Sequence, residues 1–194
     1  MINIKTNIAQ FINTEIKRYA KIQTDATVST TNKIARQGLT ESQRSIREEY
    51  NVKLKDLNKD HRGKRLMYVT TTTRLSKPAV ITAVAVGISL GKFKAKQKET
   101  GVEVQVRKSG SPKIIKHAFG PRIARLGRSV FTRYDPKISG EYRERSGRLP
   151  IYRLYGPSPA RMFMNKTVEK RLRTMVATKF PIVFAQEMKY RMNK

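Results

Sequence analysis

The chain has 194 residues, of which 42 are Lys or Arg and 14 are Asp or Glu, so its formal net charge is +28. A compact monomer with this charge repels itself, and the composition therefore indicates a polyanion, with nucleic acid the leading candidate, or an acidic protein surface as partner. The absence of cysteine excludes disulfides and thiolate metal sites, and no apolar run reaches the roughly 18 to 20 residues of a membrane-spanning helix.

The charge is concentrated after the first 60 residues. Residues 1–60 carry 11 basic and 7 acidic side chains, whereas residues 61–194 carry 31 and 7. We therefore expect an N-terminal helical arm (1–60) that contacts a protein, and a basic α+β domain (61–194) that faces a polyanion. Hydrophobic residues make up 38% of the chain, which is on the low side for a core, so contacts between subunits should complete the burial.

The first 60 residues have helical periodicity. Apolar residues recur near the N-terminus at Ile4, Ile8, Phe11 or Ile12, and Ile16. This spacing predicts an amphipathic helix to about residue 22, followed by a second helix over about 25–37 that ends at Gly38. Thr40 and Gln43 have the form of a capping box, so a third helix should begin there, with a possible break at Asn51.

After residue 65 the pattern favours strands. Residues 66–73 are rich in β-branched side chains, and residues 79–90 alternate bulky with small side chains, which predicts the strongest strand of the chain. Residues 102–106 alternate valine with polar residues and should pair with 79–90 as an antiparallel hairpin through a turn at 96–101. Shorter strands are predicted around 114–115, 130–131 and 150–155.

The C-terminal part should contain one more helix. Gly156, Pro157 and Pro159 end the strand at 150–155, and a helix should begin at Met164 or Asn165. An internal proline removes a helical hydrogen bond, so Pro181 predicts a kink or a break. The predicted fold class is α+β, with N-terminal helices, a mostly antiparallel sheet with a long hairpin, and a kinked C-terminal helix.

Few residues suggest catalysis. The two histidines, His61 and His117, are far apart in sequence, and the carboxylates of the basic region are scattered rather than grouped as a two-metal nuclease requires. Ser89 lies between Gly87 and Gly91 with the glycine spacing of a nucleophile elbow, but a strand pattern surrounds it and a plausible histidine partner is missing. We predict no enzyme, and no catalytic, cofactor-binding or metal-binding residue.

Several basic residues are candidates to face DNA. Lys92, Lys94 and Lys96 occupy the same alternate positions as the bulky residues of the strand predicted just before them. They could form a row that contacts DNA phosphates, or a charged strand end that prevents pairing with another strand edge. Arg122, Arg125 and Arg128 would share a face on a helix but not on a strand. The full set of DNA-facing candidates is Lys92, Lys94, Lys96, Lys113, Lys116, Arg122, Arg125 and Arg128. Aromatic residues are sparse in the chain, so binding should be directed at the DNA backbone and should be sensitive to salt.

The segment Arg148-Leu-Pro-Ile-Tyr-Arg-Leu-Tyr-Gly-Pro-Ser-Pro-Ala-Arg-Met-Phe163, followed by a closing helix with Phe184 and Glu187, resembles the signature of phage minor tail protein Z and related tail-completion proteins. The resemblance covers roughly residues 60–192 in the order of elements, and its specific part is 148–163. It implies a structural virion component in the neck region of the tail, assembled in the host cytoplasm, rather than an enzyme.

The resemblance also implies partners. A ring of subunits, most plausibly hexameric, would surround the DNA channel at the head-proximal end of the tail and complete head–tail joining. It would contact the tail terminator protein, with the tape-measure protein and the head connector as further expected neighbours. The candidates for subunit or tail contacts are Leu149, Pro150, Tyr152, Tyr155, Gly156, Pro157, Phe163 and Phe184. The alternative, supported by charge alone, is a freestanding sequence-independent nucleic-acid-binding protein.

Overall fold

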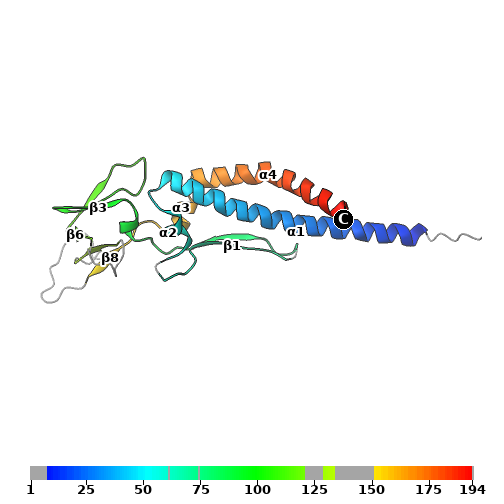
Figure 1. Cartoon of the computed structure of the whole chain (residues 1–194), viewed down its shortest axis with the longest axis horizontal. Helices are drawn as coiled ribbons and strands as arrows, with labels where there is room; N and C mark the ends of the chain where they lie inside the picture. Colours follow the sequence, from blue (N-terminus) through cyan, green and yellow to red (C-terminus); the bar gives the residue numbers. More distant parts are fainter. Residues whose placement is uncertain (1–7, 61, 74, 121–128, 134–150, 194) are drawn as a thin grey trace, which may run out of the picture. The chain divides into compact units, whose positions relative to one another are not determined.

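The computed structural model describes residues 8–60, 62–73, 75–120, 129–133 and 151–193. Two long helices, α1 and α4, account for most of the helical structure, and α4 packs against α1 (Figure 1). The remaining elements are short helices and short strands, and the strands form three small antiparallel sheets, so the predicted α+β class is confirmed. The elements in chain order are α1 (Ile8–Glu49), α2 (Leu54–Asn58), β1 (Met67–Thr70), β2 (Val80–Ala83), the 3-10 helix η1 (Leu90–Lys92), β3 (Ala95–Lys98), β4 (Gly101–Val104), β5 (Lys113–Lys116), β6 (Ala118–Phe119), β7 (Val130–Thr132), β8 (Tyr152–Leu154), α3 (Pro159–Phe163) and α4 (Lys166–Met192).

The chain divides into two compact units. One unit, called here the helix-pair unit, contains residues 1–38, 69–81 and 173–194. The other, called the sheet unit, contains residues 39–68 and 82–172. Both α1 and α4 contribute residues to each unit.

Helix α1 is continuous, so the prediction of three separate N-terminal helices is wrong. Gly38 was expected to end a helix, but it is buried inside α1, where packing offsets the cost of about 1 kcal/mol that glycine carries in a helix. Gln43 does not act in a capping box, because its side-chain amide donates a hydrogen bond to Asn58 Oδ1 at 2.6 Å. The predicted break near Asn51 is confirmed, since α1 ends at Glu49 and the Asn51 backbone donates to Val106 O at 2.9 Å.

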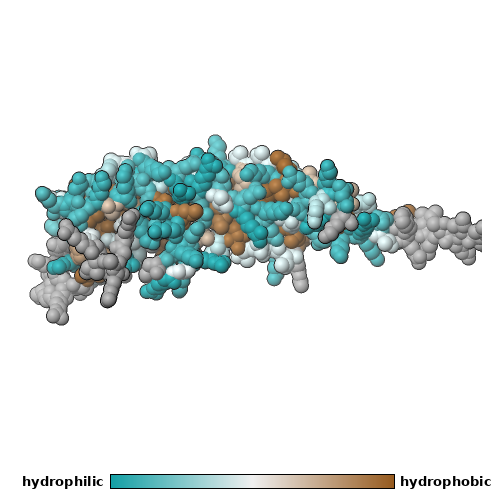
Figure 2. Space-filling model, in the orientation of Figure 1, coloured by the Kyte–Doolittle hydropathy of each residue, from teal (hydrophilic) through white to brown (hydrophobic). Residues whose placement is uncertain are grey.

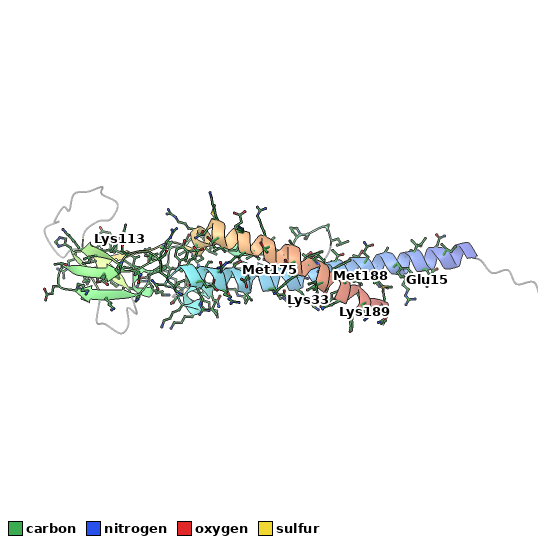
Figure 3. All side chains as sticks on the ribbon, turned by 90° about the horizontal axis from the view of Figure 1, so that it is seen from above. Glu15, Lys33, Lys113, Met175, Met188 and Lys189 are labelled. Atoms are coloured by element: carbon green, nitrogen blue, oxygen red, sulfur yellow. The ribbon has the colours of Figure 1, made fainter. Side chains whose placement is uncertain are left out.

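Polar contacts join α1 to α4 in both units. In the helix-pair unit, the carboxylate of Glu187 on α4 is buried and accepts hydrogen bonds from Lys33 on α1 and from Arg191. Lys33 lies beside the turn of α4 that carries Met188 (Figure 3). In the sheet unit, Glu48 on α1 pairs with Arg171 on α4.

Two carboxylates in these pairs are held ionised. The hydrogen bond from Lys33, and after it those from Arg191 and Ser29, lower the pKa of Glu187 below its ordinary value of 4.5, while burial opposes them. The hydrogen bond from Arg171 is the main cause that lowers the pKa of Glu48. Helix α4 continues through Pro181 without a break. Phe180 and Phe184 precede and follow Pro181 in the sequence, and their stacked rings have centroids 6.2 Å apart.

The strand predicted over residues 79–90 is much shorter in the structure. Only β2 forms a ladder, with β1, and the chain then continues irregularly to η1. The predicted hairpin between 79–90 and 102–106 is wrong, because β4 pairs with β3 in the register Ala95↔Val104 and Lys98↔Gly101. The second neighbour of β4 is β5, which confirms the strand predicted at 114–115. β7 and β8 confirm the strands expected near 130 and 152.

The main apolar core belongs to the sheet unit. Its fully buried centre includes Ile46 from α1, Leu57 from α2, Phe93 and Met162, and strand valines pack around these side chains. Burying a large side chain of this kind contributes about 1.5 to 3 kcal/mol. Polar residues cover most of the visible face, with small apolar patches between them (Figure 2).

The turn after β8 is tied closely into this core. A Cβ atom on Gly156 would lie 2.8 Å from the Phe93 ring and 3.0 Å from Leu90, so only glycine fits there. The Gly156 backbone donates to Ile88 O at 2.7 Å. Ser158 then caps α3 by accepting a hydrogen bond from the Arg161 backbone, and Pro159 occupies the first turn of α3, where no backbone donor is needed.

Candidate nucleic-acid interface

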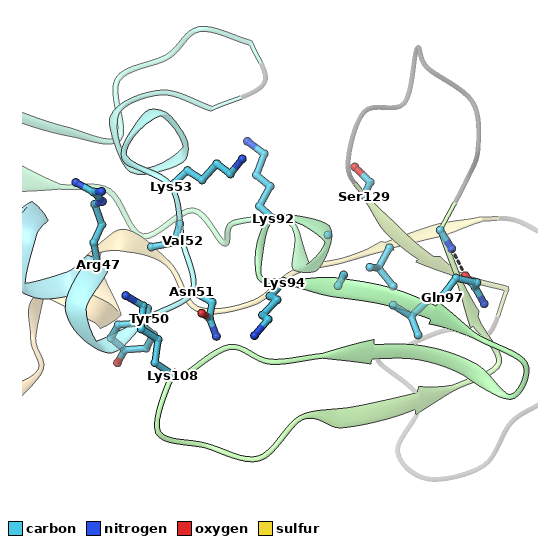
Figure 4. Close-up of a pocket in the computed structure, with 15 residues that line it drawn as sticks. Arg47, Tyr50, Asn51, Val52, Lys53, Lys92, Lys94, Gln97, Lys108 and Ser129 are labelled. Carbon is cyan, nitrogen blue, oxygen red and sulfur yellow. Dashed lines mark hydrogen bonds between the residues drawn. The ribbon is translucent and has the colours of Figure 1, made fainter.

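An open hollow of about 620 Å³ on the sheet unit gathers five cationic side chains from separate segments (Figure 4). Those side chains belong to Arg47, Lys53, Lys92, Lys94 and Lys108. None of the described residues that line the hollow is an aspartate or a glutamate. A concentration of positive charge at one concave surface is the electrostatic pattern that attracts a polyanion.

Each cation is placed by the local fold. Arg47 lies in the last turn of α1, and Lys53 follows in the extended link to α2. Lys92 is the last residue of η1, and Lys94 has a φ of 37°, a left-handed conformation that a non-glycine residue adopts only at some cost. The Lys108 backbone donates to Glu49 O at 2.9 Å, which fixes the start of the loop after β4 against the end of α1.

Lys92 differs from the other four cations because it has an acidic partner. Its Nζ lies 2.8 Å from Oδ1 of Asp56, a buried residue of α2. Within the described residues, no carboxylate forms an ion pair with Arg47, Lys53, Lys94 or Lys108, and all four side chains are exposed. Lys92 therefore neutralises Asp56, and the remaining four charges are available to an anion.

Buried apolar residues form the wall of the hollow. Tyr50, Val52, Val102 and Val130 line it and also belong to the core of the sheet unit. The ring of Tyr50 is further held by the guanidinium of Arg107, which lies 5.6 Å from the ring centroid. A wall that is part of the core fixes the backbone positions from which the cations project, so the segments that carry them need not be ordered when a ligand is bound.

The hollow includes two of the DNA-facing candidates predicted from sequence, Lys92 and Lys94. Lys96 lies on β3 and is exposed, so the predicted single strand with a row of three lysines is wrong. Its premise was a strand running through residues 79–96, whereas η1 interrupts that stretch. Lys113 and Lys116 are exposed at the two ends of β5, and Arg122, Arg125 and Arg128 lie outside the described residues.

Sequence reasoning missed Arg47, Lys53 and Lys108. They come from a helix end, a link and a loop, and no periodic spacing connects them. One signal in the sequence was usable: the predicted break at Asn51 indicates that the chain changes direction between Arg47 and Lys53.

The candidates for subunit contacts have different environments. Gly156 and Phe163 pack on the core, so their first role is in folding. Pro157 and Phe184 are half-buried, as is Tyr152 on β8, whereas Tyr155 is exposed. Leu149 and Pro150 lie outside the described residues.

Over the ranges that the structure describes, no three His, Cys, Asp or Glu side chains are grouped as a metal site would require. The helices in these ranges likewise lack an apolar stretch long enough to cross a membrane. Comparisons with protein-family models, curated proteins and solved structures found no match.

Proposed function

We propose that the chain is a structural tail-completion protein of a long-tailed phage. In this role, copies of the chain form a ring at the head-proximal end of the tail, contact the tail terminator protein and surround the DNA channel. The function is mechanical and electrostatic, and no reaction is assigned to it. The resemblance of residues 148–163 to minor tail protein Z supplies the setting, and the charge of +28 fits a position around DNA.

The observation that carries the proposal is the cation-lined hollow. Four cations that have no ion pair among the described residues lie above a buried wall and can contact phosphates without reading bases. Among the described residues that line the hollow, the aromatic one is Tyr50, which is buried in the wall and offers bases no exposed ring for stacking. Duplex DNA held by its backbone, independently of sequence, is the ligand that suits this surface.

An exposed apolar stripe on α1 supports assembly with other proteins. Ile12, Ile16 and Tyr19 recur at helical spacing, yet about half or more of each side chain is exposed. Residues 8–25 carry three basic and two acidic side chains, a net charge of +1, so this part of α1 attracts DNA less than the strongly basic region after residue 60 does. A helix with an apolar stripe and little net charge suits contact with a neighbouring subunit or a tail protein.

Light scattering coupled to size exclusion, at low and high salt and with or without the tail terminator protein of the same phage, tests the proposal. A closed ring near the expected hexamer, formed alone or only with the terminator, would support it. A monomer that changes mass only when DNA is added would favour the alternative, a freestanding nucleic-acid-binding protein, which the hollow would serve equally well.

A further inference from the structure

We propose that a second hollow of the sheet unit binds an acidic segment with apolar side chains from a partner protein. This hollow, of about 760 Å³, is lined by the cations Arg107, Arg161 and Lys166 and by the exposed side chains of Tyr155 and Met164. The inference goes beyond the proposed function, because it assigns a protein ligand to a separate surface and does not require a ring.

The hollow lies where the turn after β8 leads into α4. Arg161 projects from α3, and Lys166 is the first residue of α4. Asn165 caps α4, since its side-chain oxygen accepts a hydrogen bond from the Thr167 backbone at 3.1 Å. The N-terminus of this 27-residue helix adds a partial positive charge to that of the three side chains.

Two carboxylates reduce this positive charge but do not cancel it. Glu49 accepts a hydrogen bond from the Asn165 side chain, and Glu169 lies in the first turn of α4. Neither carboxylate is among the residues that line the hollow. Arg107 contacts the ring of Tyr50, but that contact leaves its charge available. The hollow therefore retains an attraction for anions.

Exposed apolar side chains distinguish this hollow from the cation-lined hollow. Met164 is 78% exposed and Tyr155 is 54% exposed, and both line the second hollow. The described apolar residues of the cation-lined hollow are buried in its wall, apart from the half-buried Ala95. A phosphodiester gains nothing from covering methionine, whereas a peptide that places carboxylates beside Leu or Phe would satisfy both kinds of side chain.

The test uses the full chain and a fluorescein-labelled peptide of about 12 residues that alternates Glu or Asp with Leu or Phe. The variant Arg161→Gln/Lys166→Gln should weaken peptide binding about tenfold, the sum of two exposed charge contacts. Met164→Ser should weaken it about fivefold through lost apolar contact. All three residues are exposed, so the variants should fold.

Two controls separate this site from general attraction to a basic protein. The matched variant Lys53→Gln/Lys94→Gln loses the same charge from the cation-lined hollow and should leave peptide affinity within about twofold. A peptide of equal charge with Ser in place of Leu and Phe should bind the wild type several-fold more weakly.

Equal loss of peptide binding in both double variants, equal affinity for the Ser peptide, or no binding by the wild type would each overturn the inference. So would a loss of affinity for duplex DNA, rather than peptide, in Arg161→Gln/Lys166→Gln, because the hollow would then belong to the DNA-binding face. The assay uses the isolated chain, so a failure of ring formation in light scattering would leave its result unchanged.

Discussion

Replacing Glu187 by Gln should loosen the contact between α1 and α4 in the helix-pair unit. The buried carboxylate accepts hydrogen bonds from Lys33 and Arg191, and a neutral amide loses the charge that strengthens both. Each charge-assisted hydrogen bond contributes about 1.5 to 3 kcal/mol when its partners are desolvated. The Lys33 side chain is 55% exposed and that of Arg191 is 24% exposed, so water partly replaces the lost partner.

We therefore expect Glu187→Gln to lower the free energy of unfolding by about 1 to 3 kcal/mol near pH 7. Urea denaturation followed by circular dichroism measures the change. Glu15→Gln is the matched control, because Glu15 pairs with Arg18 at 3.7 Å on an exposed face of α1 and should contribute less than about 0.5 kcal/mol.

The effect should depend on pH with a defined sign. The pKa of Glu187 is lower in the folded chain than its ordinary value of 4.5, so the folded state binds fewer protons there than the unfolded state. The extra stability is complete above pH 4.5 and disappears as the pH falls through the lower, folded pKa. The wild type and Glu187→Gln should converge in that acidic range. A variant as stable as wild type at neutral pH, or a gap that widens with acid, would refute the reasoning.

Three further substitutions test packing and hydrogen bonds in the two units, with Gly156 and Ser158 in the sheet unit and Asn32 in the helix-pair unit. Gly156→Ala should destabilise the chain by about 1 to 3 kcal/mol in urea denaturation, because the new methyl group would overlap the buried ring of Phe93. The control Gly110→Ala should be nearly neutral, because the new methyl group would have its nearest neighbouring atom at 3.6 Å. Asn32→Ala should cost about 1 to 3 kcal/mol, since its amide makes two hydrogen bonds with the Thr72 backbone, at 2.7 and 2.8 Å; an unchanged midpoint would exclude their contribution. Ser158→Ala should cost about 0.5 to 2 kcal/mol through loss of the α3 cap, and hydrogen exchange at the Arg161 amide should rise; equal protection in both proteins would contradict that role.

Local patterns predicted most elements of the fold but not their lengths or pairing. The short strands β5, β7 and β8 were predictable from β-branched and aromatic residues between turn signals. The length of α1 was not, because Gly38 is a strong local stop signal and its burial depends on packing that the sequence does not display. Alternation over 79–90 predicted a long strand, yet only its first part pairs, as β2 with β1. Gly87 and Ile88 in its second part contact the turn after β8 instead.

The candidate site was less predictable than the fold. Net charge indicated an anionic ligand, and Lys92 and Lys94 could be named from their position after a strand-like run. Arg47 and Lys108 are 61 positions apart and line the same hollow because Tyr50, just after α1, pairs with Arg107 in the loop after β4. Lys and Arg occur so often in this chain that their positions alone carry little information.

The salt dependence of duplex DNA binding tests the central claim most directly. The variant Lys53→Gln/Lys94→Gln/Lys108→Gln should lower the slope of log K against log salt by about three, because each phosphate contact contributes about 0.9. The control Lys17→Gln/Lys21→Gln/Lys179→Gln removes the same charge from exposed positions of the helix-pair unit and should lower it by less than about one. Equal slopes for the two variants would mean that DNA responds to net charge alone, and the assignment of the hollow would be wrong.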